Sequence, residues 1–205
     1  MRAQFLPLLG ITLFFLVGIV FRAGLHYRRY GTTGLALFQT SDRAKLLRDA
    51  LFTALFVLPV MQALFVAITP DTMSHLYLVA PNNFINFLGA LLLFGSIPLI
   101  LGAQLGMGSS WRVGIDESSR PGLVTDGPYR FCRNPIYVAM FFSLAGITIL
   151  VPTLISLITL AVTLYVVRTQ TLEEEAFLLR TYGEQYRHYA AQVGRFVPGV
   201  GKLSS

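Results

Sequence analysis

Charged residues are scarce in this chain of 205 residues. They make up 13% of it, whereas 54% of its residues are hydrophobic and the mean hydropathy is +0.63; soluble domains carry about 25% charged residues. The single cysteine, Cys132, excludes a disulfide framework and a multi-cysteine zinc site, and three scattered histidines argue against a histidine-built metal site. We therefore expect a small bundle of membrane helices without a metal, and not an ordinary water-soluble globule.

Four stretches without a charged residue are long enough to enter a membrane, which takes about 20 apolar residues. They are residues 3–21, 50–70, 84–105 and 134–167. The last one has 34 residues, and as one straight helix it would be about 51 Å long, too long for a single crossing. Pro152 lies near its middle, and proline breaks or kinks a helix. One kinked span or a hairpin of two helices would both fit.

The distribution of Lys and Arg decides between these two arrangements. Six of them follow the first stretch, four lie in the connector 106–133 and five lie beyond residue 167, but none lies in 71–83. The positive-inside rule places the three basic segments in the cytoplasm, so the fourth stretch must go out and return. This predicts an all-α, multi-pass protein of the cell inner membrane with five transmembrane helices, the last two forming a hairpin. The amino terminus would be outside and the carboxyl terminus cytoplasmic, with 15 of the 16 basic residues inside.

The predicted topology divides the chain into two parts and accounts for its excess positive charge. Residues 1–105 would be three transmembrane helices, and residues 106–205 would hold the cytoplasmic connector, the hairpin and an amphipathic C-terminal helix. The net charge of +6 then reports orientation in the membrane, so we expect the lipid bilayer and no nucleic acid as a partner.

Two polar segments beside the hairpin hold most of the chemistry. In the connector, Asn134-Pro135 has the form of an N-cap followed by proline at the first helical position, and such a helix start attracts anions. After the hairpin come three consecutive glutamates, 173–175. They are either a solvated helix face or functional carboxylates, since carboxylates so close to the hydrocarbon are costly.

Weaker features lead to three further expectations. Gly102 and Gly106 have the spacing of a close helix–helix contact. Trp111 is expected to be an anchor at the membrane interface. A stripe at helical spacing is also suited to that interface; it consists of Leu178, Tyr182, Tyr186, Tyr189 and Val193.

The segments LVTDGPYRFCRNPIYV and EEEAFLLRTYGEQYRHYAAQVGRFVP resemble the isoprenylcysteine carboxyl methyltransferase family. These are small integral-membrane enzymes, and their relatives include methyltransferases that act on phospholipid amines or small thiols. The resemblance covers residues 122–198. Its pattern falls on Leu123, Val124, Gly127, Tyr129, Arg133, Asn134, Pro135, Tyr137, Glu174, Glu175, Leu178, Gly183, Tyr186, Tyr189, Arg195 and Pro198.

The resemblance implies S-adenosyl-L-methionine as the cofactor, bound on the cytoplasmic side, and a lipophilic or small methyl acceptor. The backbone at Leu123 and Val124 would pair with adenine, Asn134 and the helix start would receive the cofactor's carboxylate, and Glu174 would bind its ammonium group. The cofactor-binding positions of the family fall on Gly122, Leu123, Val124, Tyr129, Asn134, Pro135, Ile136, Tyr137 and Glu174.

The chain departs from the family pattern at the residue that holds the substrate carboxylate. The family's arginine falls on Gln170, and Arg168 lies two residues earlier, about 200° away around a helix. Gln170 shares a helical face with Glu174, so both are expected in the pocket and are catalytic candidates. Arg168 is the third candidate, as the alternative replacement for the missing arginine. The sequence thus predicts a pocket without a fixed cation, and a neutral, thiol or amine acceptor in preference to an acid.

Two other classes of function stay open at this stage. The first is an NADPH-dependent membrane reductase of the sterol reductase type, which has a similar C-terminal pattern but is longer. The second is a non-enzymatic transporter, which is disfavoured because charges within the spans and inverted repeats are lacking.

Overall fold

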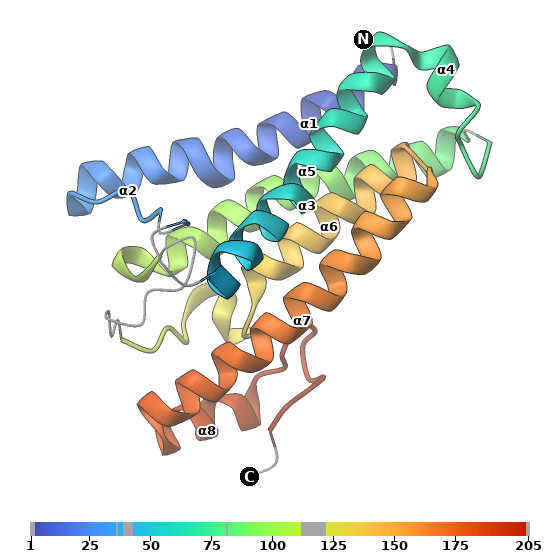
Figure 1. Ribbon diagram of the computed structural model, residues 1–205. Helices are drawn as coiled ribbons and strands as arrows, with labels where there is room; N and C mark the ends of the chain where they lie inside the picture. Colours follow the sequence, from blue (N-terminus) through green and yellow to red (C-terminus); the bar gives the residue numbers. More distant parts are fainter. Residues whose placement is uncertain (1–2, 36, 39–42, 81, 112–121, 204–205) are drawn as a thin grey trace.

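The computed structural model describes residues 3–35, 37–38, 43–80, 82–111 and 122–203, and within them the chain is helical without a β-strand (Figure 1). This confirms the expected all-α class for the described residues. Most of the long helices run side by side, with the N-terminus and α4 at one end and α8 at the other. The helices are α1 (Leu6–Phe15), α2 (Arg22–Tyr30), α3 (Arg43–Ile68), α4 (Pro70–Ser74), α5 (Asn83–Gly106), α6 (Pro135–Leu150), α7 (Leu154–Tyr182) and α8 (Glu184–Gln192).

The first membrane helix is longer than the sequence predicted. A π-helical segment, Leu16–Phe21, joins α1 to α2, so helical backbone continues to Tyr30. It ends at Gly31, whose φ of 75° lies in the left-handed region that glycine tolerates. Arg22, which was expected in a cytoplasmic loop, is 1% exposed. The Arg22 guanidinium donates hydrogen bonds to backbone oxygens, so the helix can continue past this charge.

Among the described residues, four helical segments are long and apolar enough to cross a membrane: Leu6–Tyr30, Leu46–Ile68, Asn83–Gly106 and Leu154–Tyr182. The break at Pro152 is present, since α6 ends at Leu150 and α7 begins at Leu154 with Thr153 as its N-cap. With 16 residues, α6 is about 24 Å long, so a fifth complete crossing stays a prediction. With 29 residues, α7 exceeds one crossing and extends past the apolar region.

Glycines bring α5 and α6 together at the centre of the bundle. A Cβ atom added at Gly146 on α6 would lie 2.6 Å from the backbone nitrogen of Leu93 on α5, and one added at Gly89 would lie 2.8 Å from the side chain of Ile149. The expectation for Gly102 was wrong, because nothing lies within 4 Å of a Cβ atom there, and Gly106 makes only ordinary contacts. The sequence spacing identified the wrong glycine pair because small residues at this interval also occur on faces without a neighbour.

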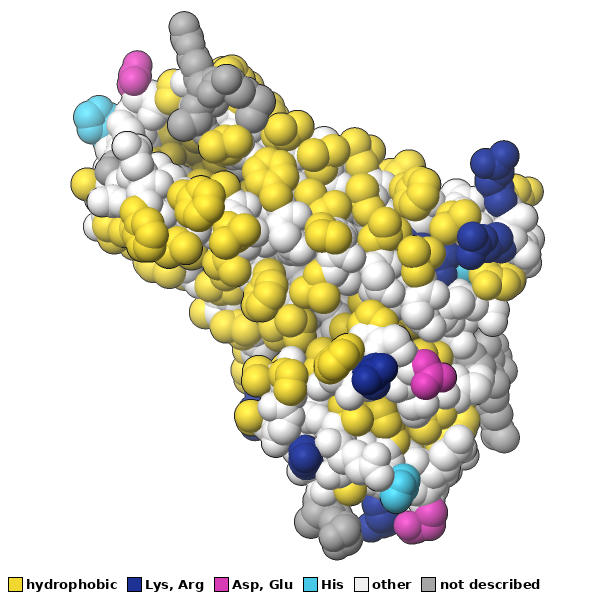
Figure 2. Space-filling model, turned by 180° about the vertical axis from the view of Figure 1, so that it is seen from behind, with side chains coloured by type: hydrophobic (Ala, Val, Ile, Leu, Met, Phe, Trp, Pro, Cys, Tyr) yellow, Lys and Arg dark blue, Asp and Glu magenta, His cyan; other side chains and the backbone are white. Residues whose placement is uncertain are grey.

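The outer surface of the bundle is apolar along its length. Large hydrophobic side chains are exposed on α1, α3, α5 and α7, among them Leu9, Phe65, Phe87 and Ile158. Figure 2 shows hydrophobic side chains over the body of one face of the molecule, while the Lys and Arg side chains on that face lie away from the end that holds α4. Such a surface requires an apolar surrounding, as expected of an integral membrane protein.

Candidate functional site

A cavity of about 1030 Å³ lies between α1, α3, α5, the connector, α6, α7 and α8. One side of it is apolar and includes Phe14, Phe52 and Phe56, while the opposite side is polar and tyrosine-rich. The polar side is built by the start of α6, the last turns of α7, and α8.

The cavity brings together eight of the nine positions predicted to bind the cofactor: Gly122, Leu123, Val124, Tyr129, Asn134, Ile136, Tyr137 and Glu174. The ninth, Pro135, is less than 2% exposed and does not line the cavity. Segments 122–137 and 170–189, far apart in the sequence, thus form one concave surface.

Asn134 is the N-cap residue of α6, but its side chain does not cap the helix. Its amide Nδ2 donates to the backbone oxygen of Arg195 at 3.0 Å instead. The expected capping contact was therefore wrong, because the C-terminal segment competes for this side chain. The first turn of α6 consequently faces the cavity without a side-chain cap, and its N–H groups suit an anion.

Glu175 holds two arginines in a buried ion-pair network, which we call the Glu175 network. Arg195 binds it in a bidentate manner, with Nε 2.9 Å from Oε1 and an Nη 2.8 Å from Oε2. Arg133, whose side chain is 2% exposed, contacts Oε1 at 2.6 Å. Arg133 also donates to the backbone oxygens of Ala190, Val193 and Gly201. The network joins the connector to α7, α8 and the C-terminal segment, and both Nη atoms of Arg133 donate within it, while its buried Nε has no hydrogen-bond partner among the described residues.

Tyrosines from α8 and the connector line the polar side of the cavity. Burial raises the pKa of Tyr129 and of Tyr186 far above the ordinary phenol value, so both stay neutral. The Tyr189 hydroxyl donates to the backbone oxygen of Tyr129 at 2.7 Å. The expected membrane-facing stripe was wrong for Tyr186 and its neighbours, since Leu178, Tyr182, Tyr186 and Tyr189 line the cavity. Gly183, with φ 51°, breaks the helix and turns α8 inward.

The predicted catalytic candidates separate in space. Gln170 and Glu174 both line the cavity, whereas Arg168 is exposed and lines neither the cavity nor the smaller hollow beside it. A regular α7 explains this, because residues four apart share a face and residues two apart do not. The expected positions of Gln170 and Arg168 relative to the cavity therefore hold, while their roles stay predictions.

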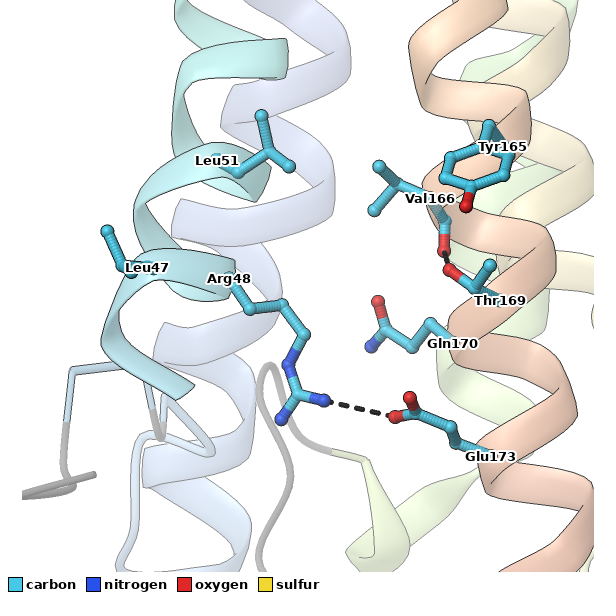
Figure 3. Close-up of a pocket in the computed structure, with 8 residues that line it drawn as sticks. All are labelled: Leu47, Arg48, Leu51, Tyr165, Val166, Thr169, Gln170 and Glu173. Carbon is cyan, nitrogen blue, oxygen red and sulfur yellow. Dashed lines mark hydrogen bonds and ion pairs between the residues drawn. The ribbon is translucent and has the colours of Figure 1, made fainter. Parts of the chain in front are cut away.

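Sequence reasoning missed several charged residues of the cavity, among them Arg48 on α3. The smaller hollow, of about 310 Å³, lies between α3 and α7 and shares Arg48, Gln170 and Glu173 with the main cavity. An Nη of Arg48 donates to Oε2 of Glu173 at 3.1 Å, and Figure 3 shows this contact beside Gln170. The sequence counted Arg48 only as a cytoplasmic loop charge, because no local pattern reveals that α3 packs beside α7.

Three polar or aromatic residues near the other end of the cavity are also buried. Trp111 is 2% exposed with the Arg22 guanidinium 4.5 Å from its ring centre, so the expectation of an interfacial anchor was wrong. An Nη of Arg22 donates to the backbone oxygens of Gln104 and Gly108. Gln104 donates from Nε2 to the backbone of Gly18 at 2.8 Å. Its Oε1 has no hydrogen-bond partner among the described residues.

Burial raises the pKa of the Cys132 thiol, so it is mainly protonated at neutral pH. Its backbone forms an isolated bridge with Gly194. Because the thiolate is the reactive form of cysteine, these facts support a structural residue and not a nucleophile.

A family model described as phospholipid methyltransferase matches residues 84–185, about half of the chain. Curated relatives named protein-S-isoprenylcysteine O-methyltransferase are 33% identical over 86 residues in Mus musculus and 30% identical over 96 residues in Schizosaccharomyces pombe. A third, from Arabidopsis thaliana, is 32% identical over 116 residues. The chain is therefore similar to phospholipid methyltransferases and to protein-S-isoprenylcysteine O-methyltransferases over part of its length. The similar segments cover 42%, 46% and 52% of this chain.

These relatives are longer than the part that matches. The similar segments span only 30%, 41% and 59% of those three relatives. A solved structure titled as that of the eukaryotic intramembrane Ras methyltransferase ICMT shares the fold, with a TM-score of 0.54 and 20% identity. The likeness covers 96% of this chain and 75% of that one. The helical architecture is thus shared along nearly the whole chain.

Proposed function

We propose that this protein is an integral-membrane, S-adenosyl-L-methionine-dependent methyltransferase that acts on a lipophilic or small acceptor from the cytoplasmic side. The observation that carries the proposal is the single cavity lined by eight of the nine predicted cofactor positions, together with Gln170. The names of its curated relatives support the same reaction.

The residues of the cavity fit the chemistry of this cofactor. The Glu174 carboxylate suits an ammonium group, and the uncapped first turn of α6 suits a carboxylate. Tyr129, Tyr137 and Tyr186 suit a sulfonium cation, since aromatic rings attract cations. The backbone at Leu123 and Val124 can hydrogen-bond the edge of adenine. A volume of about 1030 Å³ leaves room for an acceptor, since small-molecule pockets occupy about 300–1000 Å³.

The cofactor would supply an electrophilic methyl group, and the chain would supply alignment and a dry site. Glu174 and the start of α6 would fix the donor, while the phenylalanines of α3 would hold an apolar acceptor and exclude water. Holding two reactants in line can supply up to about 7–11 kcal/mol. A carboxylate or thiolate acceptor attacks without a general base, which agrees with the neutral phenols of the cavity. The apolar part of the acceptor would enter sideways between helices.

Cofactor binding tests this proposal against its rivals. The protein purified in detergent should bind S-adenosylhomocysteine with a Kd in the micromolar range, about −8 kcal/mol at 1 μM, and should not bind NADPH. Binding of NADPH alone would support a reductase, and binding of neither would contradict an enzyme of either class.

A transfer assay identifies the acceptor. Native membranes that contain the protein, incubated with S-adenosylmethionine carrying a tritiated methyl group, should yield a labelled lipophilic product. Mass analysis of that product gives the acceptor class. Membranes that contain Glu174→Gln should yield much less label.

A further inference from the structure

The main cavity and the smaller hollow meet at the Arg48 guanidinium, which lies beside the Gln170 amide and the Glu173 carboxylate. Arg48, Gln170 and Glu173 are the three residues that line both of them, so the Arg48 guanidinium lies at their common boundary. Figure 3 shows Arg48 reaching from α3 toward Glu173 on α7, with Gln170 one turn earlier. The expectation of a pocket without a cation thus fails, because α3 supplies one from the opposite wall.

The neighbours of Arg48 on α3 form an apolar track along the cavity. Phe52, Phe56 and Val60 follow Arg48 at intervals of four residues, and all of them line the cavity. Phe52 and Phe56 stack edge to face with ring centres 4.8 Å apart. Residues four apart share a helical face, so one face of α3 presents a positive group at one end of an apolar strip. This is the pattern that matches an amphiphile with an anionic head.

Glu173, the described ion-pair partner of Arg48, holds it only weakly. The side chains of Arg48 and Glu173 are 30% and 64% exposed, and exposed ion pairs contribute little because water screens them. The contact uses one N–H of the five that a guanidinium carries. A planar carboxylate can take two of those donors in parallel. An anionic ligand can therefore replace Glu173 at small cost.

The other arginines of the cavity are less suited to this role. Arg133 is occupied by the Glu175 network and three backbone oxygens. Arg180 follows Gln170 by ten residues, about 15 Å along α7, beyond Glu174, and it does not line the smaller hollow. Of the arginines that line the cavity within the described chain, Arg48 is the one placed beside both Gln170 and the apolar track.

We propose that Arg48 recognises the ionised acid of a lipophilic acceptor, exchanging Glu173 for the ligand's carboxylate while the apolar chain lies along Phe52, Phe56 and Val60. This inference rests on the proposed methyltransferase function and adds to it a specificity-determining residue on α3. Gln170 donates a further hydrogen bond from the facing wall. Arg48 is a binding residue here, and the donor site around Glu174 is separate from it.

The test measures whether the preference for a charged ligand over an uncharged one depends on Arg48. Purified protein saturated with S-adenosylhomocysteine is titrated with N-acetyl-S-farnesylcysteine and with its uncharged carboxamide, which differ in the acid group. The unmodified protein should bind the acid at least tenfold more tightly than the carboxamide. In Arg48→Gln this difference should vanish while carboxamide affinity stays within twofold. Arg29→Gln, an exposed arginine on α2, is the control and should keep the full preference.

Two further variants separate recognition from structure. Glu173→Gln should keep or increase the acid preference, because it removes the competing carboxylate. Arg48→Gln combined with Gln170→Arg should restore the preference, since a guanidinium returns to the same boundary from α7. In methyl transfer to the acid, Arg48→Gln should raise KM at least tenfold with a smaller change in kcat.

The possible outcomes distinguish the role of Arg48 from the proposed methyltransferase function. Failure to bind S-adenosylhomocysteine would contradict the methyltransferase itself. Normal S-adenosylhomocysteine binding with no preference for the acid would overturn the role of Arg48 alone. Equal losses of acid and carboxamide binding in Arg48→Gln would assign the residue a structural role, and loss of the preference in Arg168→Gln with Arg48 intact would assign recognition to Arg168.

Discussion

Neighbouring glutamates on α7 have different surroundings and should therefore respond differently to the same substitution. Glu175 is buried between Arg133 and Arg195, whereas Glu174 is exposed toward the cavity. The side chains lie about 100° apart on the helix, so one faces the protein and the other the proposed donor site.

Glu175→Gln should destabilise the protein by about 3–5 kcal/mol, because it leaves the buried Arg133 charge without its counter-ion. Glu174→Gln should leave the free energy of unfolding within about 0.5 kcal/mol, as expected for an exposed position. It should instead weaken S-adenosylhomocysteine binding by about 1.5–3 kcal/mol through loss of a charge-assisted hydrogen bond. Unfolding in detergent and ligand titration on both variants measure the contrast. Equal stability of the two variants would mean that the Glu175 network contributes little.

At the scale of helices, the contact of α5 with α6 depends on glycine at particular positions. A Cβ atom at Gly146 would meet backbone atoms of α5 at 2.6 and 2.7 Å, which a side chain rotation cannot relieve. Gly102, in the middle of another apolar stretch of α5, has open space instead.

Gly146→Ala should lower the free energy of unfolding by about 1–3 kcal/mol, the usual cost of overpacking. Gly102→Ala is the matched control and should raise stability by up to about 1 kcal/mol, the difference in helix propensity. Thermal unfolding of both variants in the same detergent gives the comparison. A Gly146→Ala protein as stable as the parent would show that α5 and α6 can separate without loss.

Much of the helical arrangement was predictable because it depends on local patterns. The charge-free stretch 84–105 set α5 to within one residue at each end, and Pro152 marked the break between α6 and α7, but the first and last spans continue past charged residues. The motif residues on both sides of the hairpin also converge on one cavity, as the resemblance implied. Features that depend on neighbours from other helices were not predictable. Arg48 reaches the cavity because α3 packs beside α7, and the buried Trp111 lies against Arg22 and His26 of α2.

At the scale of the whole molecule, the basic residues predict how the chain lies in the membrane. The loop between α3 and α5 contains no Lys or Arg, whereas the opposite end holds nearly all of them. The positive-inside rule then places α4 outside and α8 in the cytoplasm.

Cysteine labelling in intact cells tests this orientation. A cysteine introduced at the exposed Ser74 should react with a membrane-impermeant maleimide, whereas one at the exposed Gln192 should react only after permeabilisation. The native Cys132 should contribute little background, since it is buried and its pKa is raised, which keeps the thiol protonated at neutral pH. Labelling of Gln192→Cys in intact cells would reverse the proposed topology.

During synthesis, the site can form only after the C-terminal residues of the Glu175 network have been added to the chain. Arg195 follows Glu175 by 20 residues, and the carbonyls of Val193 and Gly201 complete the surroundings of Arg133. A nascent chain that has reached only Gln192 already holds all its long apolar helices but lacks these groups. The hydrophobic segments can therefore enter the bilayer before the polar side of the cavity exists. Insertion of the apolar helices therefore does not require the Glu175 network, whereas the polar side of the cavity does.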